Sequence, residues 1–118
     1  MSLQVVYCNH QTTELDLRER LAFATADQLS MAYKQLHTLF PASEAVVLST
    51  CNRVEVYTAQ DDVEEAPTRG ELAEFISRFH GIPVGEFFEG LSNQTGPEVA
   101  RHLFRVCSSV DSMVLGEP

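Results

Sequence analysis

The sequence predicts an α+β fold: an antiparallel sheet with helices packed on one face, in the order β-α-β-β-α-β-α, close to ferredoxin-like. Two kinds of pattern carry the prediction. Residues 54–58 alternate between apolar and polar side chains, the period of two that is typical of a half-buried strand. Segments 29–40, 72–79 and 99–110 instead place apolar residues at helical spacing.

The first half of the chain opens with a strand and continues with two helices. Residues 4–8 are apolar and partly β-branched, which predicts a short buried strand. A short helix is expected over 17–23. Thr25 and Gln28 have the spacing of a capping box, so a second helix is predicted over 26–40, where a proline follows and ends it.

A β-hairpin, or a sharp strand–loop–strand, is predicted over 44–60. Two strand-like runs flank the polar stretch STCNR at 49–53. Asn52 is the turn-prone residue between them, which places Cys51 at or next to the tip of the hairpin. The acidic stretch 60–67 follows and is expected to be a flexible loop.

Two more helices and a strand complete the predicted fold. Thr68 and Glu71 form a second capping-box pattern, and Gly81 closes the helix that it opens. Residues 86–91 are expected to form a fourth strand at an edge of the sheet. Pro97 marks the first turn of a last helix. The apolar stripe of that helix comprises Val99, Leu103, Val106 and Val110.

The composition fits a single domain over residues 1–118. Hydrophobic residues make up 44% and charged residues 21%, a globular balance. No apolar run approaches the roughly 18 residues of a membrane span, and the first residues lack the pattern of a secretory signal. Three cysteines without a C-x-x-C pair favour a reduced, cytoplasmic compartment and no metal site.

The net charge bears on the kind of partner. Eight basic residues against 17 acidic ones give a formal charge of −9. A surface this acidic repels a phosphate backbone, so the net charge of the chain would not attract a nucleic acid. An RNA partner would have to be held by shape and a few placed groups, and we expect weak RNA binding by this chain alone.

Cys51 is the first candidate for chemistry. A thiolate is a strong nucleophile, and a neighbouring cation favours it; Arg53 lies two residues further on. The alternative is a buried structural cysteine, which is common. The polar stretch between two apolar strands favours a site without deciding the matter.

His102 is the second candidate. On a helical wheel it lies roughly 80° from the centre of the apolar stripe, at the edge of the buried face. There it could reach a pocket as a base or bond to a backbone carbonyl, and both interpretations stay open. Cys8, within a buried strand, and Cys107, beside the helical stripe, are expected to be inert.

Four motifs give the chain a family resemblance. They are NHQT at 9–12, LRER at 17–20, STCNR at 49–53 and DSMVLGEP at 111–118. In this order and spacing the chain resembles the N-terminal catalytic domain of glutamyl-tRNA reductase along its full length.

The resemblance implies a mechanism. Cys51 matches the nucleophile that takes the glutamyl group from glutamyl-tRNA as a thioester, which NADPH reduces to glutamate-1-semialdehyde in the first step of tetrapyrrole (5-aminolevulinate) biosynthesis. His102 matches a histidine associated with activity, as a base or as an orienting group. Arg53 would be a partner for the glutamate carboxylate. The other implied substrate-binding residues are Thr50, Asn52, Ser112, Glu117 and Pro118.

The resemblance also implies parts that this chain lacks. It covers roughly a quarter to a third of such an enzyme and contains no G-x-G-x-x-G motif, so we expect the NADPH-binding and dimerisation domains to be missing. The whole enzyme would be a homodimer that hands its product to glutamate-1-semialdehyde aminomutase. Alone, the chain would be at most a weak glutamyl-tRNA esterase. The alternative function is a non-catalytic module that binds RNA or protein.

Overall fold

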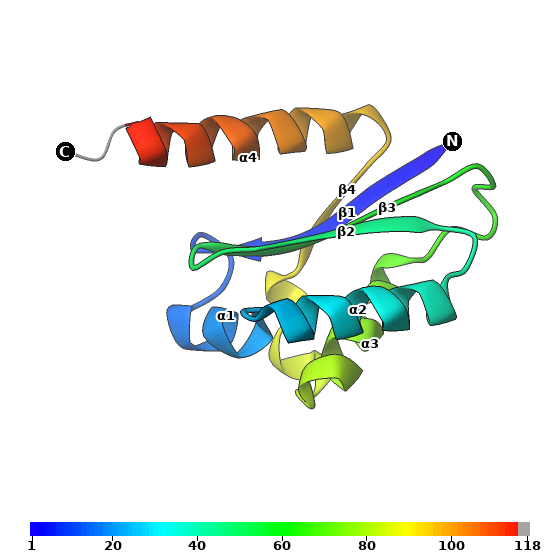
Figure 1. Cartoon of the computed structure of the whole chain (residues 1–118), viewed down its shortest axis with the longest axis horizontal. Helices are drawn as coiled ribbons and strands as arrows, with labels where there is room; N and C mark the ends of the chain where they lie inside the picture. Colours follow the sequence, from blue (N-terminus) through cyan, green and yellow to red (C-terminus); the bar gives the residue numbers. More distant parts are fainter. Residues whose placement is uncertain (116–118) are drawn as a thin grey trace.

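A four-stranded antiparallel sheet forms the centre of the molecule. The computed structural model describes residues 1–115, with side chains up to Ser108. The strands lie in the order β2-β3-β1-β4, and all neighbours pair antiparallel, which is the strand order of a ferredoxin-like sheet (Figure 1). Their bounds are β1 Ser2–Asn9, β2 Glu44–Ser49, β3 Arg53–Gln60 and β4 Ser92–Thr95. The predicted α+β class and antiparallel sheet are confirmed.

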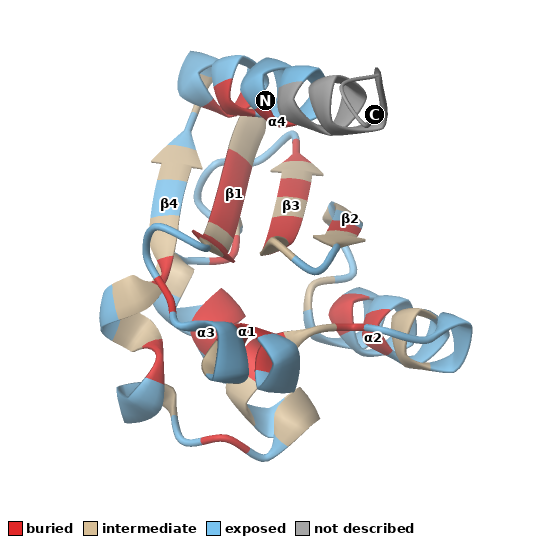
Figure 2. Ribbon diagram, turned by 90° about the vertical axis from the view of Figure 1, so that its left-hand side faces the viewer, coloured by how far each residue is buried: buried red, intermediate tan, exposed pale blue. Residues whose placement is uncertain are grey.

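The helices lie on both faces of this sheet, so the expectation of a single covered face is wrong. The four α-helices are α1 Leu15–Leu21, α2 Ala26–Leu39, α3 Arg69–His80 and α4 Pro97–Leu115. Helices α1, α2 and α3 cover one face, whereas α4 crosses the opposite face alone (Figure 2). The physical reason is that the sheet has a second buried row of side chains, on β1 and β3, which α4 covers.

The main core lies between the sheet and helices α1–α3. Alternate residues of β1 and β3 point into it because successive side chains of a strand face opposite sides. The strands contribute Val6, Cys8, Val54 and Val56, and the helices and their connections contribute Leu21, Phe23, Ala32, Leu36, Leu72, Phe75 and Ile76. All of these side chains are buried.

The predicted helix ends on this face are confirmed. Thr25 and Thr68 each accept a hydrogen bond from the backbone three residues on, from Gln28 and Glu71, whose side chains accept from the cap backbone in return. Gly81 ends α3 in the left-handed conformation, with φ of 67°, which glycine adopts without steric cost.

The fourth strand does not lie at 86–91, as the sequence predicted. Two short 3₁₀ turns, η1 (Val84–Glu86) and η2 (Phe88–Gly90), occupy this segment, and β4 begins at Ser92. The guanidinium of Arg69 donates to the carbonyls of Phe88 and Leu91, at 2.8 and 2.9 Å. These backbone groups are therefore bonded to α3, and the segment packs below the sheet edge without joining it.

Helix α4 buries a different stripe from the predicted one. Val99, His102 and Val106 are buried, whereas Leu103 is 41% exposed. Val110 lies beyond the residues whose side chains are described. Positions 99, 102 and 106 fall on one helical face, and Leu103 is turned away by about 100° from His102. A histidine can face the sheet here because the sheet offers it a polar partner.

Candidate active site

The turn between β2 and β3 carries Cys51 at its tip, as predicted, and the cysteine is exposed. The turn is held by two short-range bonds. The backbone N–H of Thr50 donates to the carbonyl of Arg53 at 2.9 Å, and the N–H of Asn52 donates to Oγ1 of Thr50 at 3.2 Å. The polar residues of the STCNR motif thus fix the backbone that presents the thiol.

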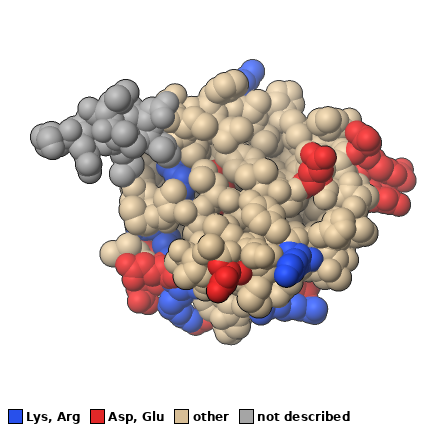
Figure 3. Space-filling model, viewed as in Figure 1, with Lys and Arg blue, Asp and Glu red and all other residues tan. Residues whose placement is uncertain are grey.

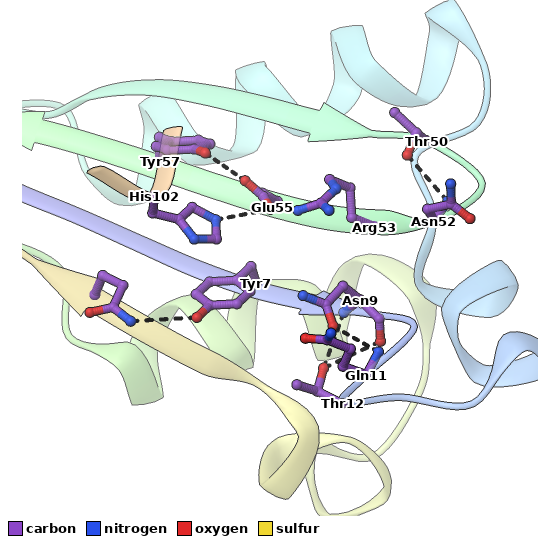
Figure 4. Close-up of polar contacts among 11 residues, drawn as sticks. Tyr7, Asn9, Gln11, Thr12, Thr50, Asn52, Arg53, Glu55, Tyr57 and His102 are labelled. Atoms are coloured by element: carbon purple, nitrogen blue, oxygen red, sulfur yellow. Dashed lines mark hydrogen bonds and ion pairs between the residues drawn. The ribbon is translucent and has the colours of Figure 1, made fainter. Parts of the chain in front are cut away.

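Neighbouring segments hold this turn against the rest of the domain. Oγ of Ser49 accepts a hydrogen bond of 3.0 Å from the backbone N–H of Phe23, which lies between α1 and α2. On the other side, Asn9 at the end of β1 pairs with Arg53 at the start of β3. The loop after Asn9 is ordered by the N–H of Gln11, which donates to Oδ1 of Asn9 at 2.9 Å (Figure 4).

A fully buried carboxylate, Glu55, lies two residues beyond Arg53 on the same face of β3. Its Oε2 accepts from Nη1 of Arg53 at 3.0 Å and contacts Nε2 of His102 at 3.0 Å. Its Oε1 accepts from the hydroxyl of Tyr57 at 2.5 Å. Figure 4 shows the carboxylate among these side chains, with His102 reaching it from α4. Three groups from β3 and α4 thus converge on one buried acid.

Aromatic rings complete this buried polar cluster. The ring of Tyr7, on β1, lies against the imidazole of His102 with centroids 4.1 Å apart. Burial raises the pKa of the Tyr57 hydroxyl far above its usual range, and the hydrogen bond to Glu55 adds to the shift. Tyr57 therefore keeps its proton at any physiological pH and acts as a donor to the carboxylate.

Sequence reasoning missed Glu55. The alternation of residues 54–58 assigned Glu55 to a solvent-facing row, which would be correct for a sheet covered on one face only. The side chain is instead 0% exposed because α4 covers that row. The available signal was the polar row Glu55 and Tyr57, together with a long helix that carries a histidine at the edge of its predicted apolar stripe.

Among the described residues, no cluster of three or more His, Cys, Asp or Glu side chains could hold a metal ion. None of the helices in that part of the chain is both long and apolar enough to cross a membrane.

Comparison with known proteins decides the family. A family model described as "Glutamyl-tRNAGlu reductase, N-terminal domain" matches residues 6–118. The chain belongs to this glutamyl-tRNA reductase family. The resemblance drawn from the sequence motifs is thereby confirmed.

Individual members of the glutamyl-tRNA reductase family agree with this assignment. Over the whole chain, the sequence is 39% identical to the glutamyl-tRNA reductase of Thermodesulfovibrio yellowstonii and 42% identical to that of Neisseria gonorrhoeae. A solved structure, the glutamyl-tRNA reductase from Methanopyrus kandleri, matches 98% of the chain with a TM-score of 0.67 and 30% identity. The chain covers 28%, 26% and 24% of these three proteins, so it spans about a quarter of their length.

The residues that the glutamyl-tRNA reductase resemblance singled out fall into three groups. Thr50, Cys51, Asn52 and Arg53 lie together in and beside the β2–β3 turn. His102 bonds to Glu55, two residues past that turn's end. Ser112 lies in the last part of α4, beyond the side chains that the structure describes, and Glu117 and Pro118 lie outside the described residues.

The other two cysteines differ from each other in exposure. Cys8 lies in the main core, and burial raises its pKa, an effect only partly opposed by a hydrogen bond with Thr13. Cys107, on α4, is exposed. Exposure therefore separates Cys51 from Cys8 but not from Cys107.

Proposed function

We propose that this chain supplies the acyl-transfer site of a glutamyl-tRNA reductase, in which Cys51 takes the glutamyl group from glutamyl-tRNA. The observation that carries the proposal is the exposed Cys51 at a fixed turn, next to an arginine that a buried carboxylate holds in place. Membership of the glutamyl-tRNA reductase family supports the choice of substrate.

The proposed reaction is a transfer of the acyl group from oxygen to sulfur. The Cys51 thiolate attacks the carbonyl carbon of the ester that joins glutamate to the terminal ribose. The new C–S bond forms, the ester C–O bond breaks, and the ribose oxygen leaves with the electron pair and takes up a proton. The products are free tRNA and a glutamyl thioester on Cys51.

Arg53 is the proposed partner for the side-chain carboxylate of the glutamyl group. Its guanidinium has five N–H donors in a fixed plane, and the bond to Glu55 uses one of its two Nη atoms. A second carboxylate can therefore bind to the other donors of the same group. Thr50 and Asn52, in the turn itself, are the proposed groups nearest to the reacting ester.

The acidic loop after β3 lies at the end of the sheet away from Cys51. The exposed acidic residues Asp61, Asp62, Glu64 and Glu65 lie in the loop after β3. Figure 3 shows acidic side chains at the end of the molecule where Figure 1 places that loop, and a second group, beside basic side chains, at the lower left, where Figure 1 places α1. Strand β3 separates the loop from Cys51 by its eight residues, about 26 Å, well beyond the Debye length of about 8 Å.

The reduction itself requires a hydride donor, which in this family is NADPH. A dinucleotide fold needs adjacent parallel strands joined through a glycine-rich turn. All neighbouring strands of the described sheet are antiparallel, so this sheet does not fit NADPH, and we assign no step of the reduction to it. For the whole protein we propose reduction to glutamate-1-semialdehyde by NADPH in tetrapyrrole biosynthesis, a homodimer, transfer of product to glutamate-1-semialdehyde aminomutase, and a cytoplasmic location.

The experiment that tests the acyl transfer is mass spectrometry after acid quenching. The chain is mixed with glutamyl-tRNA, quenched within seconds, and digested to locate any added glutamyl group. We expect an adduct on Cys51 in the wild type and in the matched control Cys107→Ser, which removes the other exposed thiol. The Cys51→Ser variant should form no thioester.

Two outcomes would contradict the proposal. In Cys51→Ser, a glutamyl adduct on a residue other than Ser at position 51 would place the acyl acceptor elsewhere, because a serine hydroxyl at that position could itself form an ester. A folded wild type that forms no adduct, and whose Cys51 is alkylated no faster than Cys107, would favour the non-catalytic binding module.

A further inference from the structure

The buried carboxylate of Glu55 connects the residues on which the proposed site depends. Its Oε2 accepts a hydrogen bond from Arg53, next to the β2–β3 turn, and contacts His102 of α4. Its Oε1 accepts a hydrogen bond from the hydroxyl of Tyr57. An isolated carboxylate in such a position is strongly unfavourable, and a guanidinium 3.0 Å away compensates it. The group is therefore a connected network rather than three separate contacts.

The network assigns the proton on His102. Glu55 forms an ion pair with the guanidinium of Arg53, and the carboxylate of an ion pair only accepts hydrogen bonds. Nε2 of His102, 3.0 Å from Oε2, must therefore carry a proton and donate it into this bond. The bond therefore excludes Nε2 as the acceptor of a thiol proton and leaves only Nδ1 for that role, so a base at this position would need Nδ1 to reach Cys51.

His102 and the proposed nucleophile also differ in exposure. His102 is 6% exposed, on the side of α4 that faces the sheet. Cys51 lies exposed in the β2–β3 turn, four residues before Glu55. Between them, Arg53 extends from the start of β3 and bonds to Glu55 (Figure 4). The contacts lead from His102 to Glu55 to Arg53, and Arg53 is the member next to the turn.

We propose that Glu55 and His102 are positioning residues: His102 and Tyr57 orient the Glu55 carboxylate, and the carboxylate holds the Arg53 guanidinium ready for the substrate's carboxylate. On this view His102 does not deprotonate Cys51. The inference rests on the proposed acyl transfer and deepens it, because it says how the glutamate site is kept in shape.

Two substitutions of His102 separate positioning from general-base catalysis. In His102→Gln the amide keeps an N–H donor near the place of Nε2 but has no basic nitrogen, whereas His102→Leu lacks both. The readout is single-turnover acyl transfer from glutamyl-tRNA against substrate concentration, with folding checked by urea denaturation. We expect His102→Leu to raise the half-saturating concentration at least 10-fold, and His102→Gln to recover most of that loss. If His102→Leu and His102→Gln both lower the maximal rate of acyl transfer, and by the same factor, the proposal is wrong.

A second readout does not depend on acyl transfer. Iodoacetamide alkylates Cys51 without using Arg53, and its rate against pH reports the thiolate. We expect the midpoint of this profile to agree within about 0.3 pH unit in wild type, His102→Gln and Glu55→Gln. A midpoint that moves by a full unit in His102→Gln would make His102 the base and refute its positioning role, even if the wild type formed no glutamyl adduct.

The role of Glu55 is tested by a double-mutant cycle with Arg53. If Glu55 acts through Arg53, Glu55→Gln should raise the half-saturating concentration about 10-fold in the wild type but less than about 3-fold in an Arg53→Gln background. Equal effects in both backgrounds would show that Glu55 does not act through Arg53. If wild type and Cys51→Ser both fail to form the adduct, the proposed function fails, and the alkylation profile still decides whether His102 is a base.

Discussion

Replacing Gly90 with alanine tests the close approach between η2 and the loop that follows β1. A Cβ atom at Gly90 would lie 2.7 Å from the backbone oxygen of Thr12 and 2.9 Å from Oγ1 of Thr13. Ordinary contact begins at 3.4 Å, so the Thr12 carbonyl would have to move by the difference, about 0.7 Å. Because this atom belongs to the backbone, no side-chain rotation can relieve the clash.

The magnitude follows from two opposing effects. Overpacking of this kind costs about 1–3 kcal/mol, whereas alanine stiffens the unfolded chain and returns about 0.4–1 kcal/mol. We expect Gly90→Ala to lower the free energy of unfolding by about 1–2 kcal/mol. The free energy of unfolding falls with urea by about 2 kcal/mol per M, so the midpoint of urea denaturation should fall by about 0.5–1 M.

Gly85→Ala is the matched control. Gly85 belongs to the same segment, has no atom within 4 Å of an added Cβ, and, like Gly90, has no positive φ. Both substitutions stiffen the unfolded chain equally, so the difference between them isolates the clash. A Gly90→Ala protein with a urea midpoint equal to that of Gly85→Ala would refute the packing described for η2.

Two further predictions concern titratable groups. Burial lowers the pKa of His80, so the unfolded chain binds a proton at higher pH than the folded chain, and stability should fall as pH drops below about 6.5. His80→Phe should reduce this slope in urea midpoints measured between pH 7.5 and 5, and an unchanged slope would assign it to other groups. For the thiols, iodoacetamide should modify Cys51 and Cys107 in the native protein and Cys8 only in urea; rapid native labelling of Cys8 would contradict its burial.

The sequence by itself determined the elements whose signals are local. A capping box needs only Thr25 and Gln28 at the right spacing, and the end of α3 needs only a residue that tolerates positive φ, Gly81. The hairpin and its turn followed from the polar stretch between two strand-like runs, and this placed Cys51 correctly. The family followed from motifs of the same local kind.

Tertiary structure decided which side chains of the sheet face helix α4. Alternation along β3 separates its residues into two rows but does not say which row is covered, and α4 buries the row that holds Glu55. Spacing along α4 likewise left His102 at the edge of a stripe, because hydrophobicity alone favoured Leu103. The contact between Glu55 and His102 joins residues 47 positions apart. Such a pairing depends on how a helix docks on a sheet, which no local pattern of residues records.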